Sequence, residues 1–362
     1  MNMEKISFNQ LENLEEREST HNVYGKEKFS AEDAKKHVET IINDFGDHFG
    51  SLGYREEEPV LISSGVDSTV RFVGSPISVL KPYFIEGKIP NPGIFMHQDC
   101  IRTKNINKLL DDDFNPAWGS YFPNMGAITG PERIHEGCME AFDFFEKKLS
   151  VSKKNILIRV SSTDQDLLGI CRKRFEENNL EIDKKSLSYY RHKLGIDGVW
   201  GRNCNIALRN FDGNGFSDVG NLIIIENESS QLCLEISIGP STSLKQMHGL
   251  DHVQDCTPVV GLELIDKKYR RKLEDAIVTS TVLFREGLRP FGQNARNRIL
   301  KKYIKAISYF RIKCDLTTDE LPIVISNFEK REFGEVDELV SPVMVEFIKF
   351  FEKDLLNKGS DV

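Results

Sequence analysis

The sequence predicts an α+β protein, in which an antiparallel-rich sheet flanked by helices is followed by a helical domain. Short apolar runs separated by Gly, Pro, Asn and Ser occupy much of residues 59–236 and are typical of strands. They do not alternate regularly with crossover helices, which argues against a doubly wound parallel sheet. From Leu273 onward the spacing of the apolar residues becomes helical.

The elements before the helical domain are expected in the following order. About the first 25 residues are polar and lack a clear period, so we expect a loose arm or an edge helix. A helix should follow, because Ser30 is a typical N-cap and apolar residues recur at helical spacing from Ala34 to Phe45. The runs that we interpret as strands are residues 59–62, 70–73, 94–96, 155–160, 221–225 and 232–236.

The helical domain is expected to carry a basic surface. Between Asp266 and Lys313 the chain has 14 Lys or Arg and four Asp or Glu, a balance that suits a polyanionic partner. Positions 299, 303, 306 and 310 form one apolar stripe, so the basic residues between them should lie on exposed faces. We place the boundary near residue 265, which gives domains 1–265 and 266–362.

The composition, with 39% hydrophobic and 29% charged residues, is that of a soluble globular protein. No run approaches the roughly 18 apolar residues of a membrane helix, and the start lacks a signal-peptide core, so we expect a cytoplasmic protein without a membrane partner. The seven scattered cysteines suit reduced thiols. His248, His252 and Cys256 lie four residues apart and on one helix could bind a metal, but no fourth ligand is evident, so we predict no metal site.

The segment that ends at residues 96–103 (MHQDCIRT) carries the first resemblance to a known family. From Glu58 to Arg102 it is similar to the part of alanyl-tRNA synthetases that ends in their motif 2, with Ser63, Ser64 and Arg102 in register. In that family the motif 2 arginine grips the α-phosphate of ATP and the amino acid carboxylate, so the resemblance gives Arg102 a catalytic and ATP-binding role. Such a cation suits the reaction, because attack of a carboxylate on a phosphate brings two anions together.

Residues 120–128 (SYFPNMGAI) resemble the second half of the same motif. Its aromatic residues and Gly126 are in place, and the resemblance assigns Phe122 to ATP. The family's glutamate is replaced by Pro123, and the methionine that lines the alanine pocket is replaced by Asn124, whose amide could reach the amino acid.

Two further segments resemble the amino acid pocket of the family. Residues 197–200 (DGVW) place Trp200 on its wall, where the indole should face Arg102 across one hollow. Residues 218–223 (DVGNLI) place Asn221 and Ile223 in the same pocket. An apolar wall beside an amide would suit a small substrate side chain.

The third family motif is altered in residues 239–246 (GPSTSLKQ). By this alignment Gly239 and Ser241 belong to the amino acid site, and Lys245 and Gln246 belong to the ATP site. Gly239 replaces the aspartate that holds the substrate ammonium, and Gln246 replaces the arginine that clamps ATP. We therefore expect weak or altered use of ATP, and a substrate other than alanine or a substitute carboxylate. The candidates for that carboxylate are Glu235, Asp218 and Asp212.

Residues 285–302 resemble the region of the family that bears the acceptor end of tRNA. The resemblance assigns acceptor binding to Arg289, Arg296, Arg298 and Lys302, and the basic composition independently suits a phosphate-bearing partner. The alternative is a solvated basic face of a helix.

Together these motifs imply a class II aminoacyl-tRNA synthetase-like paralogue without the editing and C-terminal domains of the alanyl family. It would use ATP and Mg²⁺ to activate a small, alanine-like amino acid as its adenylate. The acceptor would be the 3′ end of tRNA or a nucleoside, metabolite or carrier. The altered third motif favours an alternative, a catalytically impaired paralogue that binds tRNA or an aminoacyl nucleotide as a regulator. A plain structural or interaction role is a third alternative.

Overall fold

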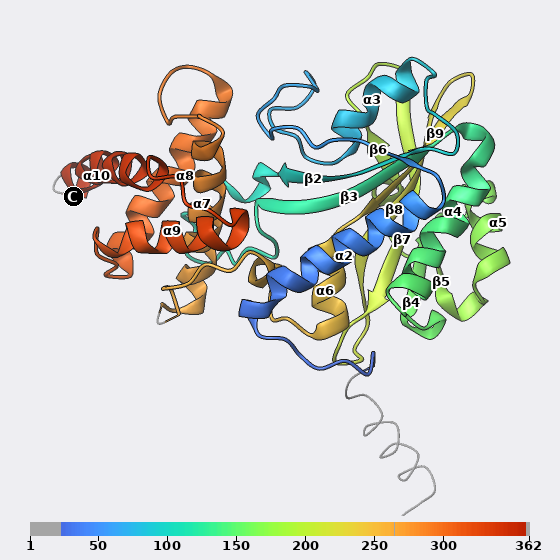
Figure 1. Cartoon of the computed structure of the whole chain (residues 1–362), viewed down its shortest axis with the longest axis horizontal. Helices are drawn as coiled ribbons and strands as arrows, with labels where there is room; N and C mark the ends of the chain where they lie inside the picture. The colour runs from blue at the N-terminus through green and yellow to red at the C-terminus, as the bar shows by residue number, and fades with distance from the viewer. Residues whose placement is uncertain (1–22, 264, 360–362) are drawn as a thin grey trace, which may run out of the picture.

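A computed structural model describes residues 23–263 and 265–359 of the chain. Figure 1 shows a sheet with helices on both faces and, beside it, a group of helices that ends in the C-terminus. The expected α+β class is confirmed, with a mainly antiparallel sheet flanked by helices and a helical C-terminal part. None of the helices in these two ranges is both long and apolar enough to cross a membrane.

The first helix of the described chain, α2 (Ala31–Ser51), confirms the helix expected there. Ala34, Val38, Ile41, Phe45 and Phe49 of this helix are buried in the main core beneath the sheet. Ser30 stands at the N-cap, but its hydroxyl donates to the carboxylate of Asp33 and accepts no backbone N–H. The arm expected before this helix falls largely on residues 1–22, which lie outside the described residues.

One nine-stranded sheet forms the centre of the described chain. Its strands are β1 (Arg55–Glu56), β2 (Ile94–Ile101), β3 (Tyr121–Thr129), β4 (Ile156–Val160), β5 (Leu180–Ile182), β6 (Arg191–Lys193), β7 (Val199–Arg209), β8 (Phe216–Asn227) and β9 (Gln231–Ile238). They follow the order β1-β2-β3-β9-β8-β7-β4-β5, and β6 pairs with β7. The pairs β1–β2 and β4–β5 are parallel, and the other pairs are antiparallel.

Four of the expected strands are confirmed, and two are wrong. The runs near 94, 155, 221 and 232 lie in β2, β4, β8 and β9. Residues 59–62 and 70–73 instead belong to a loop of residues 57–76, called here the covering loop. Ile62 and Phe72 are buried against the helical part and Val73 is buried against α3, whereas Leu61, Val66 and Val70 are exposed. The two apolar runs thus belong to a partly buried loop and not to strands.

Helices cover the two faces of the sheet unequally. On one face α2, α4 (Ile134–Asp143), α5 (Gln165–Arg174) and α6 (Pro240–His248) pack against apolar strand residues in the main core. The other face is covered by the covering loop and the short helix α3 (Ile77–Ile85), which pack against β2, β3, β8 and β9. This second face is the one that carries the candidate site.

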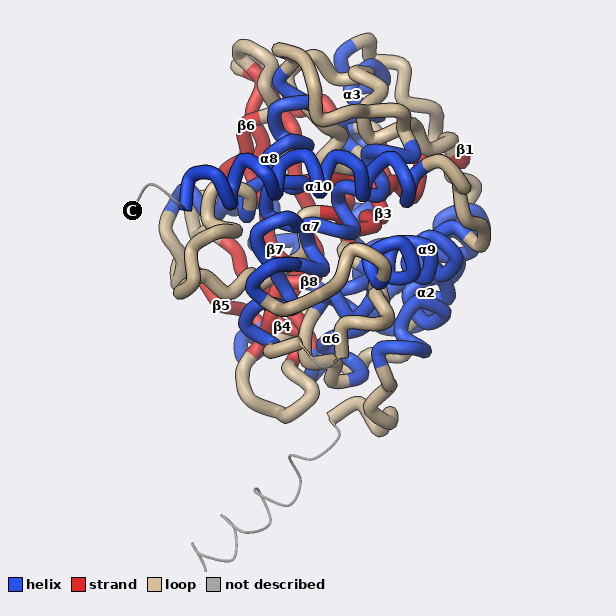
Figure 2. The backbone as a smooth tube through the Cα atoms, turned by 90° about the vertical axis from the view of Figure 1, so that its left-hand side faces the viewer, coloured by secondary structure: helices blue, strands red, loops and turns tan. Residues whose placement is uncertain are grey.

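The C-terminal helices stand at one end of the sheet, as Figure 2 shows from that side. They are α7 (Lys267–Arg285), α8 (Ala295–Lys313), α9 (Glu320–Phe333) and α10 (Val340–Gly359). The apolar stripe expected at positions 299, 303, 306 and 310 is confirmed, since all four side chains are buried. Ile101 and Tyr121, at neighbouring ends of β2 and β3, belong to the same apolar cluster. The helices begin just after the expected boundary at 265, and the division into two domains stays a prediction.

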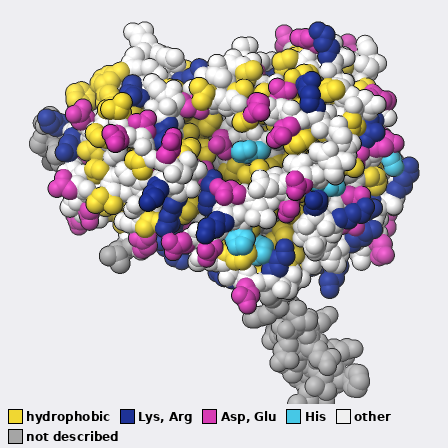
Figure 3. Space-filling model, viewed as in Figure 1, with side chains coloured by type: hydrophobic (Ala, Val, Ile, Leu, Met, Phe, Trp, Pro, Cys, Tyr) yellow, Lys and Arg dark blue, Asp and Glu magenta, His cyan; other side chains and the backbone are white. Residues whose placement is uncertain are grey.

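The helical part displays only part of the basic surface expected from its composition, since Arg298, Lys301, Lys302 and Lys305 of α8 are exposed or partly exposed while other cations are buried or paired. Arg271 and Lys272 of α7 are buried, the first between Asp255 and Glu274. The basic side chains of this part that form ion pairs include Lys267, Arg270, Arg271, Arg285, Arg311, Lys313 and Arg331. On the face seen in Figure 3, Lys and Arg are interspersed with Asp and Glu over these helices. A count along the sequence omits the acids that folding brings to these cations.

Candidate functional site

The sheet face beneath the covering loop and α3 carries a set of polar side chains. Strand residues alternate between faces and cross-strand partners share a face, so the register defines this set. Its members are Gln98, Asn124, Ser237, Glu235, Asn221, Asn203 and Asn205. All except Ser237 and Asn221 are buried. Burial of so many polar groups on one face is costly and indicates a binding surface.

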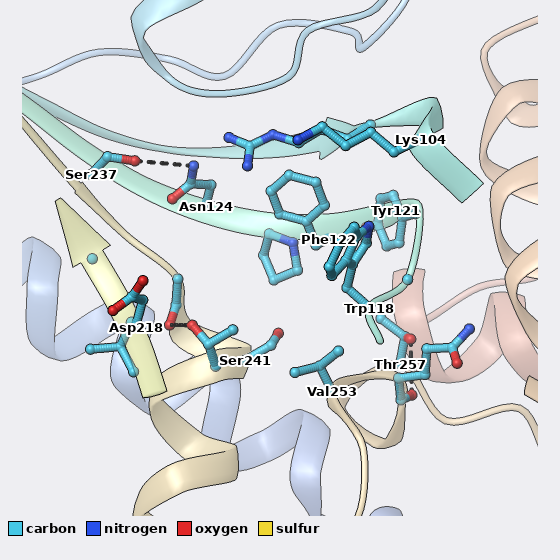
Figure 4. Close-up of a pocket in the computed structure, with 18 of the residues that line it drawn as sticks. Lys104, Trp118, Tyr121, Phe122, Asn124, Asp218, Ser237, Ser241, Val253 and Thr257 are labelled. Atoms are coloured by element: carbon cyan, nitrogen blue, oxygen red, sulfur yellow. Dashed lines mark hydrogen bonds between the residues drawn. The ribbon is translucent and has the colours of Figure 1, made fainter. Parts of the chain in front are cut away.

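A cavity of about 320 Å³ opens at one end of this polar face. Figure 4 shows Asn124 and Ser237 toward one side of it, Trp118 and Tyr121 toward the other, and Phe122 between them. Six of the sequence-predicted site residues line it together: Arg102, Phe122, Asn124, Asn221, Gly239 and Ser241. Four others, Trp200, Ile223, Lys245 and Gln246, lie outside its lining.

Arg102 directly follows β2 and is held from two sides. Its Nε donates to the carbonyl of Gly74 in the covering loop at 2.9 Å, and its guanidinium carbon lies 5.0 Å from the centre of the Phe122 ring. Its two terminal nitrogens have no hydrogen-bond partner within the described ranges. The side chain is therefore held in place, while the two terminal guanidinium nitrogens remain available to bind an anion.

The amides on the cavity floor bond mainly to one another. Asn124 Nδ2 donates to Ser237 Oγ at 3.3 Å, as Figure 4 shows. Asn205 Oδ1 accepts from Asn221 and, at 2.6 Å, from Asn203. Asn203 Oδ1 is left buried without a partner in the described residues. The floor therefore has unused acceptor capacity below the cavity.

The three candidate substitute carboxylates differ in availability. Asp218 lines the cavity, but Arg159 and the hydroxyl of Tyr189 both donate to it. Asp212 accepts from the backbone of the β7–β8 turn. Glu235 is buried on β9 and has no hydrogen-bond partner among the residues that the structure describes. Burial raises the pKa of Glu235 to about 7, against the opposing charges of Arg102 and Lys81.

The altered third motif forms the start of α6 at the cavity edge. Gly239 is the N-cap of this helix, and a Cβ there would lie 2.5 Å from Thr242 Oγ1. A side chain at position 239 would therefore require Thr242 to move. Ser241 lines the cavity, and its buried hydroxyl has no partner in the described chain. Lys245 and Gln246 follow on the same helix, beyond the cavity lining.

Trp200 does not wall the cavity, and this corrects the expectation that it faces Arg102. It pairs with Glu226 across β7 and β8, and its indole Nε1 donates to that carboxylate at 2.9 Å. By strand alternation it shares a face with Cys204, in the main core, and not with Asn203. Ile223 is on the polar face but is buried beneath α3. The alanine-type wall implied by the resemblance is therefore not formed.

The four residues assigned to acceptor binding are not gathered at one place. Arg289 donates to backbone carbonyls at the end of α7, and Arg296 donates to two carbonyls of the covering loop. Lys302 donates to the side chain of Asn107, and Arg298 is exposed. Three of the four therefore have contacts within the chain, and acceptor binding by the set stays a prediction.

The histidines and cysteine considered as metal ligands do not share a helix. His248 ends α6 and stacks on Phe29, and Gly249 then turns the chain with a φ of 66°. His252 caps the next short helical turn, where its ring accepts the backbone N–H of Gln254. Cys256 is buried behind that turn.

Sequence reasoning missed several cavity residues, among them Lys104, Trp118, Ser237 and Thr242. Ser237 had a usable signal, because residues 231–238 (QLCLEISI) alternate in a way that puts Glu235 and Ser237 on one face. Lys104 and Trp118 lie in the segment between β2 and β3, where no period predicts position.

Comparisons with known proteins connect the chain to aminoacyl-tRNA synthetases. No family model matches it. An alanine–tRNA ligase of Ehrlichia ruminantium (strain Welgevonden) is 23% identical over 242 residues, which cover 58% of this chain and 27% of that ligase. The chain thus spans about a quarter of the length of this relative.

Several solved structures superpose on it in part. A pyrrolysyl tRNA synthetase of Desulfitobacterium hafniense has 9% identity and a TM-score of 0.37 over 59% of this chain and 70% of that one. Apo histidyl-tRNA synthetase of S. aureus has 12% identity and a TM-score of 0.36 over 69% and 75%. Asparaginyl-tRNA synthetase of Pyrococcus horikoshii, complexed with asparaginyl-adenylate, has 9% identity and a TM-score of 0.36 over 62% of this chain and 67% of that one. The chain is thus similar in sequence to part of an alanine–tRNA ligase.

Proposed function

We propose that this chain activates an amino acid with ATP as a class II aminoacyl-tRNA synthetase-like enzyme. The observation that carries the proposal is Arg102, fixed by Gly74 and Phe122 with its terminal nitrogens unpaired at the cavity. In the reaction the amino acid carboxylate attacks the α-phosphorus, the bond to the β-phosphate breaks, and pyrophosphate leaves. A positioned guanidinium neutralises the charge that gathers there. Similarity to an alanine–tRNA ligase supports this reaction class.

Two features of the cavity lining support ATP as the ligand. Arg102 and Lys104 provide two cations, and Phe122 and Trp118 provide flat apolar surfaces for a base. Asp218 is the carboxylate of the described lining, and Arg159 already neutralises it. Mg²⁺ would therefore be held mainly by the phosphates with which it enters. Lys245 and Gln246 would reach ATP only after a movement of α6.

The acceptor of the acyl group is proposed to be the 3′ end of tRNA, with a nucleoside, metabolite or carrier as the alternative. Arg298 and Lys302 are the two exposed cations of the assigned set, and both lie on α8. Neutralising phosphates through such cations gives binding that weakens steeply with salt. A small acceptor would instead bind independently of these two residues.

Amino-acid-dependent exchange of labelled pyrophosphate into ATP tests the proposal directly. Wild type should show exchange with at least one amino acid, and Arg102→Ala should lower kcat/KM by about 100-fold or more, as loss of a transition-state cation does. Arg298→Ala is the matched control, because it removes an exposed arginine outside the cavity lining. Equal exchange in wild type and Arg102→Ala would contradict the proposal.

A second function is favoured by the altered third motif, namely binding of tRNA or an aminoacyl nucleotide without activation. Gln246 lacks the positive charge of the arginine it replaces, and neither Gln246 nor Lys245 lines the cavity. This function predicts no pyrophosphate exchange with any amino acid, together with salt-dependent RNA binding that weakens in Arg298→Ala and Lys302→Ala.

A further inference from the structure

The first turn of α6 borders the cavity with unpaired hydrogen-bond donors. Gly239, Ser241 and Thr242 all belong to the lining, and Gly239 is the N-cap of this nine-residue helix. Pro240 has no backbone N–H, and the N–H groups of Ser241 and Thr242 have no acceptor among the residues that the structure describes. Two N–H groups and the positive end of the helix dipole are therefore available to an anion.

The hydroxyl of Ser241 is a second, independent sign of a ligand at this turn. Ser241 is 7% exposed, and its Oγ is buried without a hydrogen-bond partner in the described ranges. Figure 4 shows its side chain pointing from α6 into the space below Phe122. Its neighbours Thr242 and Ser243 instead donate their hydroxyls to the carbonyl of Gly239, at 2.9 Å each. The helix thus leaves the Ser241 hydroxyl unused, and such a buried group is costly unless a ligand binds it.

The charges of the lining suit a ligand with several negative groups. Arg102 and Lys104 line the cavity, are exposed, and form no ion pair with a described residue. Asp218 lines it as well, but its carboxylate is paired with Arg159 and accepts the hydroxyl of Tyr189. Within the described residues the lining thus contributes two unpaired cations and one compensated carboxylate. A polyanion could therefore be held at the α6 turn and at these cations together.

We infer that the first turn of α6 is the subsite for the terminal phosphates of ATP, an inference that rests on the proposed function. The N–H groups of Ser241 and Thr242 and the Ser241 hydroxyl bind the phosphates that leave as pyrophosphate, while Arg102 binds the α-phosphate. The turn thus replaces the arginine whose place Gln246 takes, outside the cavity lining. A helix N-terminus can do this without a side-chain cation, because its backbone donors and dipole attract the phosphate.

A carboxylate of the amino acid substrate is the other oxyanion that could use these donors. Its single charge would leave Lys104 unmatched, whereas a triphosphate offers oxygens to the α6 turn, to Arg102 and to Lys104. The phosphate chain therefore accounts for more of the lining.

Calorimetric titration of the full chain with inorganic pyrophosphate tests the subsite without requiring catalysis. Wild type should bind pyrophosphate, and Ser241→Ala should weaken this binding by about tenfold, because a hydrogen bond to a charged group is lost. Ser241→Asp should weaken it by about a hundredfold or more, because it places a negative charge against the phosphates. Circular dichroism and the melting temperature of each variant show whether it is folded.

Ser243→Ala is the matched control, because it removes a hydroxyl of the same helix that already donates to Gly239 and lies outside the cavity lining. It should leave pyrophosphate binding within about twofold of wild type. Exchange kinetics add a readout that a purely structural role would not move. Ser241→Ala should raise the KM for pyrophosphate by about tenfold and leave the KM for the amino acid within about twofold.

Titration with aspartate and glutamate distinguishes the two sources of an oxyanion. Loss of their binding in Ser241→Asp, with pyrophosphate binding unchanged, assigns the turn to a substrate carboxylate and overturns the phosphate subsite. Equal pyrophosphate binding in wild type and both Ser241 variants also overturns it, and exchange by wild type then leaves amino acid activation standing. Pyrophosphate binding that weakens in both variants, without exchange by wild type, supports the subsite and contradicts activation. Absence of both binding and exchange overturns both.

Discussion

The polar face of the sheet and the junction between sheet and helices each contain a buried carboxylate, in opposite surroundings. Asp275 of α7 accepts the backbone N–H and hydroxyl of Ser120 and the amide of Asn105. Tyr303 of α8 donates in turn to the Ser120 hydroxyl at 2.8 Å. Glu235 accepts no hydrogen bond within the described residues. Burial raises both pKa values, that of Asp275 to about 6 and that of Glu235 to about 7.

The two carboxylates differ in the donors around them. Both groups are desolvated, but the donors around Asp275 are fixed by the fold, and they fasten the helical part to the start of β3. Glu235 accepts from none of the described residues, and its strand neighbour Ser237 on the same face lines the cavity. A buried polar group whose partners are all present stabilises a fold, whereas one without a partner indicates a ligand.

The largest expected effect concerns Asp275. Asp275→Ala removes the acceptor of three donors at the junction and leaves the N–H of Ser120 buried without a partner. We expect the free energy of unfolding to fall by about 4 kcal/mol. Urea denaturation followed by circular dichroism measures this. Asp251→Ala removes a solvent-exposed carboxylate that makes surface ion pairs, and it should cost less than about 1 kcal/mol.

Glu235→Gln should change stability in the opposite direction. Between pH 4.5 and about 7 the folded state holds the proton of Glu235 more tightly than the unfolded state, so wild-type stability falls as pH rises through this window. Glutamine avoids that loss. The variant should therefore be more stable than wild type by up to roughly 3 kcal/mol at pH 8, and by little at pH 4. A variant that is less stable at pH 8 would show that Glu235 has a structural role like that of Asp275.

Side chains in a strand alternate between the two faces of the sheet, and this alternation explains which site residues the sequence could predict. Arg102, Asn124 and Asn221 were found because each belongs to a short motif at a strand, where a matched residue keeps its face. Trp200 was misplaced because a shift of one residue in a strand moves a side chain to the opposite face. The helical part was predicted as an element, but charge pairs such as Arg285–Glu329 and Lys313–Asp112 were not, since they join residues far apart in the sequence.

The covering loop gives a smaller test, because helical residues hold it over the polar face. Arg296 donates to the carbonyls of Ser63 and Arg71 at 2.8 and 2.5 Å, respectively, and Glu286 accepts the N–H groups of Ile62 and Ser63. Arg296→Ala should lower the free energy of unfolding by about 1 to 2 kcal/mol and speed amide exchange in residues 62–73. If Arg296 instead served only the acceptor, neither the unfolding energy nor the exchange would change.

The smallest expected effect is that of Trp200→Ala on activity. The indole lies on the face opposite Asn203, is 36% exposed and bonds to Glu226, so its removal leaves the cavity lining intact. We expect the KM for the amino acid in pyrophosphate exchange to change by less than about twofold. Asn221→Ala, two residues before Ile223 on the polar face, should raise the same KM by about tenfold, because it removes an amide from the cavity floor. A large rise in KM for Trp200→Ala would mean that the indole reaches the substrate after all, and the contrast between the two faces of the sheet would then no longer hold.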